Sequence, residues 1–159
     1  MKIKIIAVGK IKEHALRILI KEYEKRLKPY TEIEIIEIPD LPIPKNSSPK
    51  EEEQILEKES IKIEKNIEPY DYVIALDLEG ESFDSESFSV ELMKMFALGN
   101  ACLTFLIGSS LGLSPTIRKR AQRRISFSKM TFPHQLMRLI LLEQVYRAFR
   151  IAKNEPYHK

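Results

Sequence analysis

The amino-acid sequence predicts an α/β fold, with a mainly parallel β-sheet flanked by helices. Strand-like and helix-like segments alternate along the chain, an order that is typical of parallel sheets. Residues 101–107 are mostly apolar, as expected for a strand that is covered on both faces. The chain of 159 residues contains no internal repeat and no boundary in composition, so we expect a single domain over residues 1–159.

The first part of the chain predicts two strands around one helix. Residues 2–8 alternate Lys with Ile and then become fully apolar, which indicates a strand. Residues 13–27 carry apolar side chains three and four positions apart, which indicates a helix that Pro29 ends. Residues 31–38 alternate Ile with Glu and predict a second strand. Residues 39–49 contain four prolines and no periodicity, so we expect a loop there.

A charged helix is predicted after this loop. Ser48-Pro49-Lys50-Glu51 matches a capping box with proline at the first helical position, and the helix runs to about Asn66. Because its apolar positions form only a thin stripe, we expect it to lie outside, partly solvated. Residues 72–78 are nearly all apolar before Asp77 and predict a third strand.

The next predicted elements are a helix and a fourth strand. Asp84 or Ser85 caps the helix, which runs to about Leu98 and ends at Gly99. Residues 101–107 then form the fourth strand.

A short basic helix follows, opened by Ser114 and Pro115. We expect it to hold five basic side chains: Arg118, Lys119, Arg120, Arg123 and Arg124. Residues 125–128 predict a brief fifth strand, and Pro133 opens the longest helix, which runs to about Ala152.

The longest predicted helix is apolar over more than half of its circumference. One apolar stripe consists of Met137, Leu141, Val145, Ala148, Phe149 and Ala152. A second group lies partly off this stripe: Leu136, Leu139, Ile140 and Leu142. Such a helix needs two neighbours. One is the sheet, and the other is either a second copy of the protein or deeper burial within one subunit. For so short a chain we favour a homodimer.

The composition points to a globular protein in the cytoplasm. Apolar content is ordinary and charges of both signs are mixed. No apolar run approaches the roughly 20 residues of a membrane span, and the N-terminus lacks the apolar core of a signal peptide. The single cysteine, Cys102, cannot form an internal disulfide and lies in an apolar run, so we expect a buried, inert thiol.

Positive charge is concentrated in the last part of the chain. Residues 101–159 contain 11 Lys and Arg against two acids, whereas residues 1–100 contain 15 against 21. Such segregation is typical of proteins with a polyanionic partner, and a basic face without any partner is the alternative.

Several catalytic signatures are missing from the sequence. No glycine-rich dinucleotide loop follows the first strand, and there is no phosphate-binding loop or nucleophile elbow. His14, His134 and His158 are scattered, and one cysteine offers no metal-ligand spacing. The sequence therefore argues against a nucleotide hydrolase, a serine hydrolase and a metal site.

Three loops follow predicted strands: residues 76–80, 107–112 and 127–132. In open α/β sheets, ligands bind beyond the carboxyl ends of the strands. Gly108 and Gly112 allow close backbone approach, so exposed amides and carbonyls are able to contact an adenine edge between apolar walls. Each loop alone is typical of a plain turn, but three on one edge, next to the basic helix, indicate a site.

Three segments resemble the signature of one family. They are Ser126-Phe127-Ser128-Lys129-Met130-Thr131-Phe132-Pro133-His134-Gln135, Leu141-Leu142-Glu143-Gln144-Val145-Tyr146-Arg147-Ala148 and the terminal Pro156-Tyr157-His158-Lys159. Together with the opening Lys-Ile-x-x-Ile-Ala-Val-Gly-Lys pattern, they resemble ribosomal RNA large subunit methyltransferase H, a small member of the SPOUT class. The resemblance covers essentially the whole chain.

This resemblance implies an enzyme that uses S-adenosyl-L-methionine to methylate N3 of a pseudouridine in large-subunit (23S) rRNA, on the ribosome. It also implies a homodimer and a C-terminal trefoil knot, the SPOUT α/β-knot fold. By position, the implied cofactor contacts are Leu76, Gly108, Phe127, Ser128, Lys129, Met130, Thr131 and Phe132.

The chain departs from the family pattern at two positions of the second loop. Ser109 stands where the family usually has a second glycine, and Leu111 stands where it usually has a polar residue. Serine can replace glycine only where the backbone does not need a positive φ. We therefore expect the substitutions to affect the geometry of the loop more than the activity.

Three side chains are candidates for the methyl transfer itself. The cofactor carries its methyl group on a sulfonium, so the enzyme must align donor and acceptor and help remove the proton of an imide-like nitrogen. His158 ionises near neutral pH and suits a base; as a penultimate residue it would otherwise belong to a frayed tail, and the resemblance at Tyr157 and His158 favours the site. Arg138 supports a phosphate or the ionised base, or else pairs with a nearby acid. His134 fits the fold and the site equally.

The basic helix is expected to bind RNA phosphates without reading sequence. Few aromatic side chains are available for stacking, so we expect recognition of RNA shape and of a ribosomal particle. Two other functions stay open: a non-catalytic RNA- or ribosome-binding module, and an α/β enzyme for a small anionic metabolite.

Overall fold

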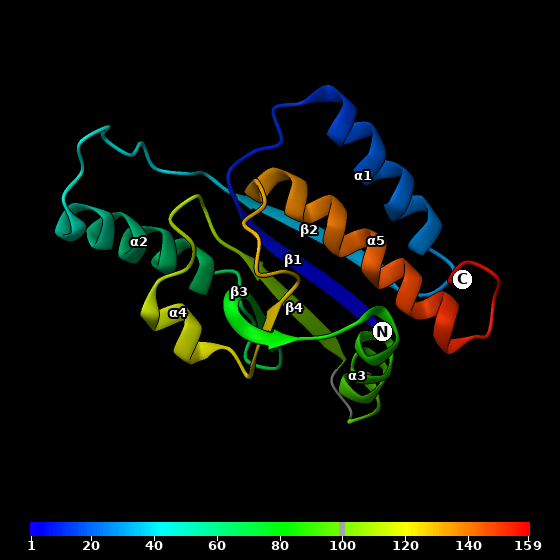
Figure 1. Ribbon diagram of the computed structural model, residues 1–159. Helices are drawn as coiled ribbons and strands as arrows, with labels where there is room; N and C mark the ends of the chain where they lie inside the picture. Colours follow the sequence, from blue (N-terminus) through cyan, green and yellow to red (C-terminus); the bar gives the residue numbers. More distant parts are fainter. Residues whose placement is uncertain (99–100) are drawn as a thin grey trace.

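The computed structural model describes residues 1–98 and 101–159 (Figure 1). These residues form five strands and five helices: β1 (Lys2–Val8), α1 (His14–Leu27), β2 (Glu32–Ile38), α2 (Pro49–Glu64), β3 (Tyr72–Ser82), α3 (Ser85–Ala97), β4 (Cys102–Ile107), α4 (Pro115–Arg120), β5 (Arg123–Ser126) and α5 (His134–Ala152). The strands form one parallel sheet in the order β2-β1-β4-β3-β5. The predicted α/β class with a parallel sheet is confirmed.

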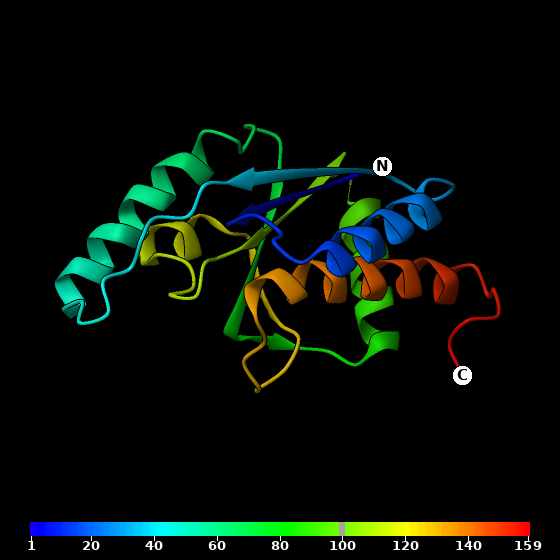
Figure 2. The same cartoon turned by 90° about the horizontal axis from the view of Figure 1, so that it is seen from above.

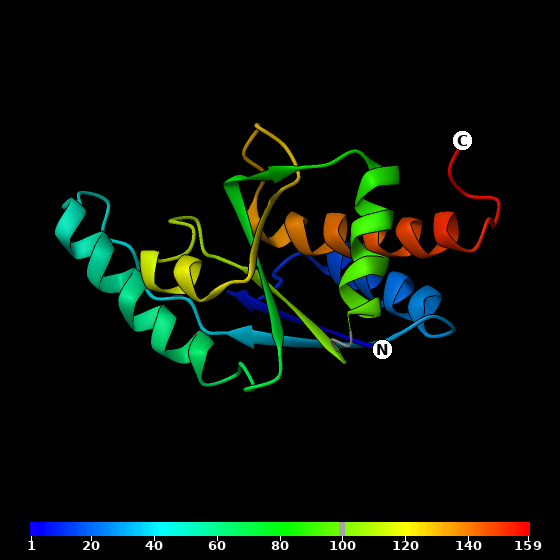
Figure 3. The ribbon, with the colours of Figure 1, turned by 90° about the horizontal axis from the view of Figure 1, so that it is seen from below.

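Helices cover both faces of the sheet and bury a separate apolar cluster on each. On one face, α3 and α5 pack on β4 and α1 packs on β2, and Phe105 and Phe149 lie in this larger cluster. On the other face, α2 and α4 pack on the sheet around Leu106, Leu113 and Ile117. Figures 2 and 3 show α2 beside α4, well away from α1 and α5. The continuous apolar run of β4 follows from this two-sided burial.

Most predicted boundaries agree with the structure to within a few residues. The capping box at the start of α2 is confirmed, since Ser48 accepts from the Glu51 amide and the Glu51 carboxylate accepts from the Ser48 amide. Asp84 is the N-cap of α3, and its side chain accepts from the Ser87 amide. The predicted end of this helix at Gly99 lies outside the described residues.

Two predictions near β5 were wrong. The short basic helix α4 ends at Arg120, so Arg123 and Arg124 belong to β5 instead. The fifth strand therefore starts and ends two residues earlier than predicted. The reason is pairing with β3: the Gln122 amide donates to the Val73 carbonyl, and the Gln122 side chain accepts from the Val73 amide, which draws the chain out of the helix and into the sheet.

The connection from β4 to β5 passes β3, because β5 lies on the far side of β3 from β4. This order is the least local feature of the sheet. The trefoil knot is a property of how the chain threads this region, and it stays a prediction that the family implies.

α5 lies between α1 and α3 as well as on the sheet (Figure 1). Leu141, Leu142, Val145, Ala148 and Phe149 are all buried within the one chain. Burial within one subunit, the alternative left open for this helix, therefore accounts for its wide apolar surface. The proposal of a homodimer has to rest on other features of the molecule.

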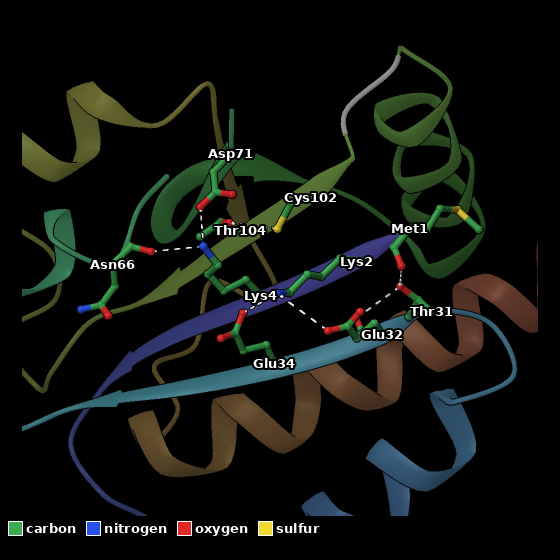
Figure 4. A network of polar contacts seen from close by, with 10 residues as sticks. All are labelled: Met1, Lys2, Lys4, Thr31, Glu32, Glu34, Asn66, Asp71, Cys102 and Thr104. Atoms are coloured by element: carbon green, nitrogen blue, oxygen red, sulfur yellow. Dashed lines mark hydrogen bonds and ion pairs between the residues drawn. The ribbon is translucent and has the colours of Figure 1, made fainter. Parts of the chain in front are cut away.

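The edge of the sheet where the strands begin holds a buried ion pair (Figure 4). The Lys4 ammonium lies 2.8 Å from an Asp71 carboxylate oxygen and donates to the Asn66 carbonyl, and both charged side chains are at most 6% exposed. Asp71 also accepts from the Glu68 amide. Beside this pair lies Cys102, half-buried rather than fully buried as expected, and burial raises the pKa of its thiol.

Within the described residues, no helix has both the length and the apolar character needed to cross a membrane.

Candidate functional site

A pocket of about 710 Å³ lies at the other edge of the sheet, where the strands end. The three predicted loops all line it: residues 76–79 of β3, residues 107–113 after β4 and residues 125–133 around the end of β5. Every predicted cofactor residue except Lys129, which is exposed, is part of this lining. The tertiary structure thus brings together the three loops that the sequence placed on one edge.

The sequence suggested that the first loop follows the end of a strand. In the structure this loop is an irregular segment inside β3. The pairing of β3 with β5 shifts register between Leu76 and Glu81, so the intervening residues bulge out toward the pocket. Gly80 lets the two strands approach, because a Cβ there would lie 2.6 Å from the Ile125 amide nitrogen. Asp77 lies in this bulge, and its side chain is only 8% exposed.

The second loop makes a tight turn between two glycines. A Cβ at Gly108 would lie 2.3 Å from the Gly112 carbonyl oxygen, so only glycine fits without a shift of the backbone. Gly112 has a φ of +83°, whereas Ser109 is not among the residues with positive φ. Serine at position 109, where the family usually has glycine, is therefore compatible with this backbone. A 2.8 Å hydrogen bond from the Gly112 amide to the Ser109 carbonyl closes the turn.

The third loop is held by two serines. The Ser126 hydroxyl donates to the Ser128 carbonyl, and the Ser128 hydroxyl accepts from the Met130 amide. These bonds leave Met130 with 73% of its surface exposed at the mouth of the pocket. Met130 therefore adds apolar surface at the mouth of the pocket.

His134, which the sequence assigned equally to fold and site, lies in the pocket lining together with Met137. Its imidazole packs against Gly9, at the end of β1. Burial, followed by the nearby Arg138 charge, lowers the pKa of His134 and favours the neutral ring. The first turn of α5 thereby contributes a neutral hydrogen-bonding group to the site.

Arg138 lies behind the pocket and not in it. The guanidinium is 1% exposed, lies 2.8 Å from a Glu37 carboxylate oxygen and donates to the Gly9 carbonyl. Pairing with a nearby acid, the alternative considered for this residue, is what the structure shows. In this position Arg138 links α5 to the ends of β1 and β2, and its role in methyl transfer stays a prediction.

Tyr157 and His158 lie along α5 at a distance from the pocket of the same chain. Tyr157 contacts Glu143, and His158 contacts Arg147. At 1.5 Å per residue these positions are roughly 13 and 20 Å along the helix axis from His134, and neither tail residue lines the pocket. Figure 1 shows the tail on the side where β1 begins.

The tail contacts aromatic and charged side chains of α5 and α3. The Tyr157 ring packs edge-on against Tyr146 and under the Arg147 guanidinium. Burial, followed by the bond with Tyr23, raises the pKa of the Tyr157 phenol, so it stays protonated and acts as a donor. His158 Nδ1 lies 3.2 Å from Arg147, and Nε2 lies 3.6 Å from Glu86.

Four of the five basic residues predicted to bind RNA are paired with acids from earlier in the chain. Arg118 and Arg124 lie within 4 Å of Asp77, and the remaining pairs are Arg118–Glu79, Arg120–Glu64, Arg123–Glu81 and Arg123–Glu91. Among the described residues only Lys119 of the five makes no such pair, and it is exposed. The free positive charge of this region is therefore smaller than the sequence suggested.

Asp77 and Arg118 line the pocket but were not predicted as cofactor-binding residues. Asp77 stood in a loop already singled out, yet nothing in the sequence distinguished it from the neighbouring Glu79. Across residues 1–98 and 101–159, no group of three or more His, Cys, Asp or Glu side chains is arranged to hold a metal ion.

Comparison with known proteins identifies the family of the chain. The family model described as "Predicted SPOUT methyltransferase" matches residues 1–158. Three similar proteins, each named ribosomal RNA large subunit methyltransferase H, come from Clostridium perfringens (strain 13; 55% identical), Clostridium botulinum (strain 657; 56%) and Carboxydothermus hydrogenoformans (52%). Each alignment covers 100% of both chains. The chain therefore belongs to the SPOUT methyltransferase family and, within it, to the family of ribosomal RNA large subunit methyltransferase H.

Proposed function

We propose that this methyltransferase transfers the methyl group of S-adenosyl-L-methionine to N3 of a pseudouridine in large-subunit rRNA, in the cytoplasm and as a homodimer. The observation that carries the proposal is the pocket at the strand ends, which is built from the three loops that hold the cofactor contacts implied by the family.

The pocket fits the proposed cofactor in size and in chemistry. Its volume of about 710 Å³ lies in the range of roughly 300–1,000 Å³ that is typical of sites for ligands of this size. Leu76, Ile107 and Phe132 offer apolar walls for an adenine ring, and the backbone of the second and third loops offers amides and carbonyls for its edge. The glycine turn lets that backbone approach closely.

The bound cofactor would supply an electrophilic methyl group on a sulfonium. The loops of the chain then have to orient this group and exclude water from the apolar part of the pocket. The neutral imidazole of His134 is suited to a hydrogen bond with an uncharged polar group beside the first turn of α5. Tyr157, whose phenol stays protonated, is suited to donate to an oxygen of the target base.

His158 is proposed as the group that takes the proton from the target nitrogen. In the conformation observed, Arg147 donates to Nδ1, and an imidazole that accepts at Nδ1 carries its own proton at Nε2. Neither ring nitrogen is then free to act as a base. The imidazole must turn away from Arg147 and Glu86 before it accepts a proton.

The position of the tail supports a homodimer. Because Tyr157 and His158 lie well along α5 from the pocket of their own chain, the tail of a second copy is the simplest way to bring these side chains to the cofactor. The exposed side chains of Ile18 and Leu19 on α1 offer apolar surface for such a contact.

Binding of the cofactor and modification of the RNA are the two tests of this function. Titration calorimetry with S-adenosyl-L-methionine should show saturable binding, and mass spectrometry should show a methylated pseudouridine in large-subunit rRNA only in cells that contain the protein. Absence of heat, together with RNA binding that is lost at high salt, would instead indicate a non-catalytic RNA-binding module.

A further inference from the structure

α2 buries a carboxyl group against the second loop of the pocket. This helix is partly solvated, as predicted, but its Glu59 is only 2% exposed. One carboxyl oxygen, Oε1, accepts from the Ser109 hydroxyl at 3.3 Å. The other, Oε2, is buried and has no hydrogen-bond partner among the described residues. A buried carboxyl group is costly to maintain, so its position calls for a physical reason.

Ser109 links Glu59 to the turn that lines the pocket. A hydroxyl carries one proton, so Ser109 donates to Glu59 and is free to accept from the Leu111 amide at 3.3 Å. The Ser109 carbonyl accepts from the Gly112 amide. Glu59 therefore determines which way the Ser109 hydroxyl points, and Ser109 in turn holds the amides of the turn.

The neighbouring residue of α2 holds the other end of the same loop. Ser60 is 4% exposed, donates to the Leu56 carbonyl and contacts the Ser114 hydroxyl. Ser114 is the N-cap of α4 and accepts from the Ile117 amide at 3.2 Å. Two consecutive buried residues of α2, Glu59 and Ser60, thus contact the second loop near its start, at Ser109, and just after its end, at Ser114.

We propose that Glu59 is a positioning residue for the cofactor: through Ser109 it fixes the turn from Ser109 to Gly112 in the shape that the cofactor binds. The proposal rests on the proposed function, because it assumes that the ligand of this pocket is S-adenosyl-L-methionine. Glu59 does not line the pocket and acts through Ser109.

The hydrogen bond between Glu59 and Ser109 allows a sharp test. Burial raises the pKa of this carboxyl, against the lowering effect of the Ser109 hydrogen bond. The side chain of glutamine matches the carboxyl in shape and keeps an oxygen that accepts from the Ser109 hydroxyl. Glutamine at position 59 should therefore preserve cofactor affinity. Alanine, which removes the acceptor for Ser109, should lower it.

The experiment compares Glu59→Ala, Glu59→Gln and the control Glu57→Ala in the full chain. Glu57 lies on the same helix but bonds to Thr116 of α4 instead of to the loop. We expect Glu59→Ala to raise the Kd and the KM for S-adenosyl-L-methionine about tenfold, as expected for loss of a buried hydrogen bond, with kcat at saturating cofactor within about twofold. Glu59→Gln should recover most of the affinity, and Glu57→Ala should match the wild type.

Ser109→Ala tests the same contact from the loop, in case Glu59→Ala fails to fold. It should raise the Kd for the cofactor by a similar factor. The double variant, with both residues changed to alanine, should have a Kd no higher than the higher of the two single-variant values, because both changes break the same contact. Equal cofactor affinity in wild type, Ser109→Ala and Glu59→Ala would overturn the inference, as would equal losses in Glu59→Gln and Glu59→Ala. Absence of binding by the wild type would overturn the proposed function and this inference with it.

Discussion

Where the strands of the sheet begin, a buried lysine and a buried aspartate are paired with each other; where the strands end, two buried side chains each keep one polar atom without a partner. At the first edge, Lys4 donates to Asp71 and to the Asn66 carbonyl. At the second edge, Oε2 of Glu59 and Nε of Arg138 have no hydrogen-bond partner among the described residues; Nε of Arg150, at the far end of α5, is the third such atom. The second edge also holds the pocket.

This difference shows how one sheet separates stability from binding. A buried pair stabilises the fold only when its remaining donors and acceptors are met, as they are around Asp71. Loops at the other edge keep backbone groups and apolar side chains available for a ligand, at the expense of packing. Changes at the first edge should therefore lower stability, and changes at the second should lower affinity.

Removal of Tyr157 through Lys159 should have the largest effect. It should lower activity although the tail lies away from the pocket of its own chain. We expect methylation of large ribosomal subunits to fall roughly 100- to 10,000-fold, the contribution typical of a general base. Cofactor affinity, measured by calorimetry, should not change, because no tail residue lines the pocket. Wild-type turnover by the truncated chain would contradict the role given to the tail.

A mixed dimer sharpens the same test. Co-expression of the truncated chain with a Gly108→Arg chain, whose pocket is blocked, should restore part of the activity if a tail serves the pocket of its partner. No recovery in a verified mixed dimer would mean that each tail serves its own chain.

Asp71→Ala should destabilise the fold by about 3–5 kcal/mol, the usual result of leaving one buried charge unpaired. Urea unfolding measures the loss. The double change Lys4→Met with Asp71→Leu should recover most of it, and Glu34→Ala, which removes a more exposed ion pair with Lys2, should cost less than about 1 kcal/mol. A small effect of Asp71→Ala would mean that this edge does not stabilise the fold as described.

Gly108→Ala should act mainly on the cofactor. The new Cβ would meet the Gly112 carbonyl, and about 1–3 kcal/mol of strain corresponds to a roughly 10- to 100-fold loss of affinity in calorimetry. Ser110→Ala, in the same loop, adds no atom to the turn and should lower the affinity less. Equal affinity of the two variants would argue against the tight turn as part of the site.

The contribution of Asp71 should also depend on pH. Burial raises the pKa of this carboxyl, but the hydrogen bonds from Lys4 and the Glu68 amide outweigh it, and the net pKa is lowered. The stabilisation is therefore present above the pKa of the unfolded chain, about 3.9, and is lost as pH falls through the lower pKa of the folded state. The difference in unfolding free energy between wild type and Asp71→Ala should be constant from about pH 7 to 5 and shrink below about pH 4.

Lys119→Ala should have the smallest effect. A single unpaired cation that contacts phosphate reduces the slope of log affinity against log salt by roughly 0.7–0.9. Arg120→Ala, whose side chain is paired with Glu64, should change the slope less. A salt titration of rRNA binding compares the two, and an equal or larger effect of Arg120 would show that its ion pair opens for RNA.

Much of the fold was predictable because its signals are local. The period of the apolar residues gave β1 and α1, and the Ser48–Glu51 box gave the start of α2 to the residue. Arg123 and Arg124 were misplaced because the strand that contains them is set by pairing with β3, which no local pattern records. The bulge inside β3 was missed for the same reason.

By itself, the sequence determined the α/β class, the three loops of the pocket and the family, since each is written in local periodicity or in a contiguous motif. Only the tertiary structure decided how the charges meet. It paired arginines of residues 118–124 with acids of α2, β3 and α3, buried Arg138 on Glu37, and placed Glu59 under the second loop. These contacts join residues 32 to 101 positions apart, and side chains so distant in sequence are brought together only when the sheet assembles and water is excluded between its layers.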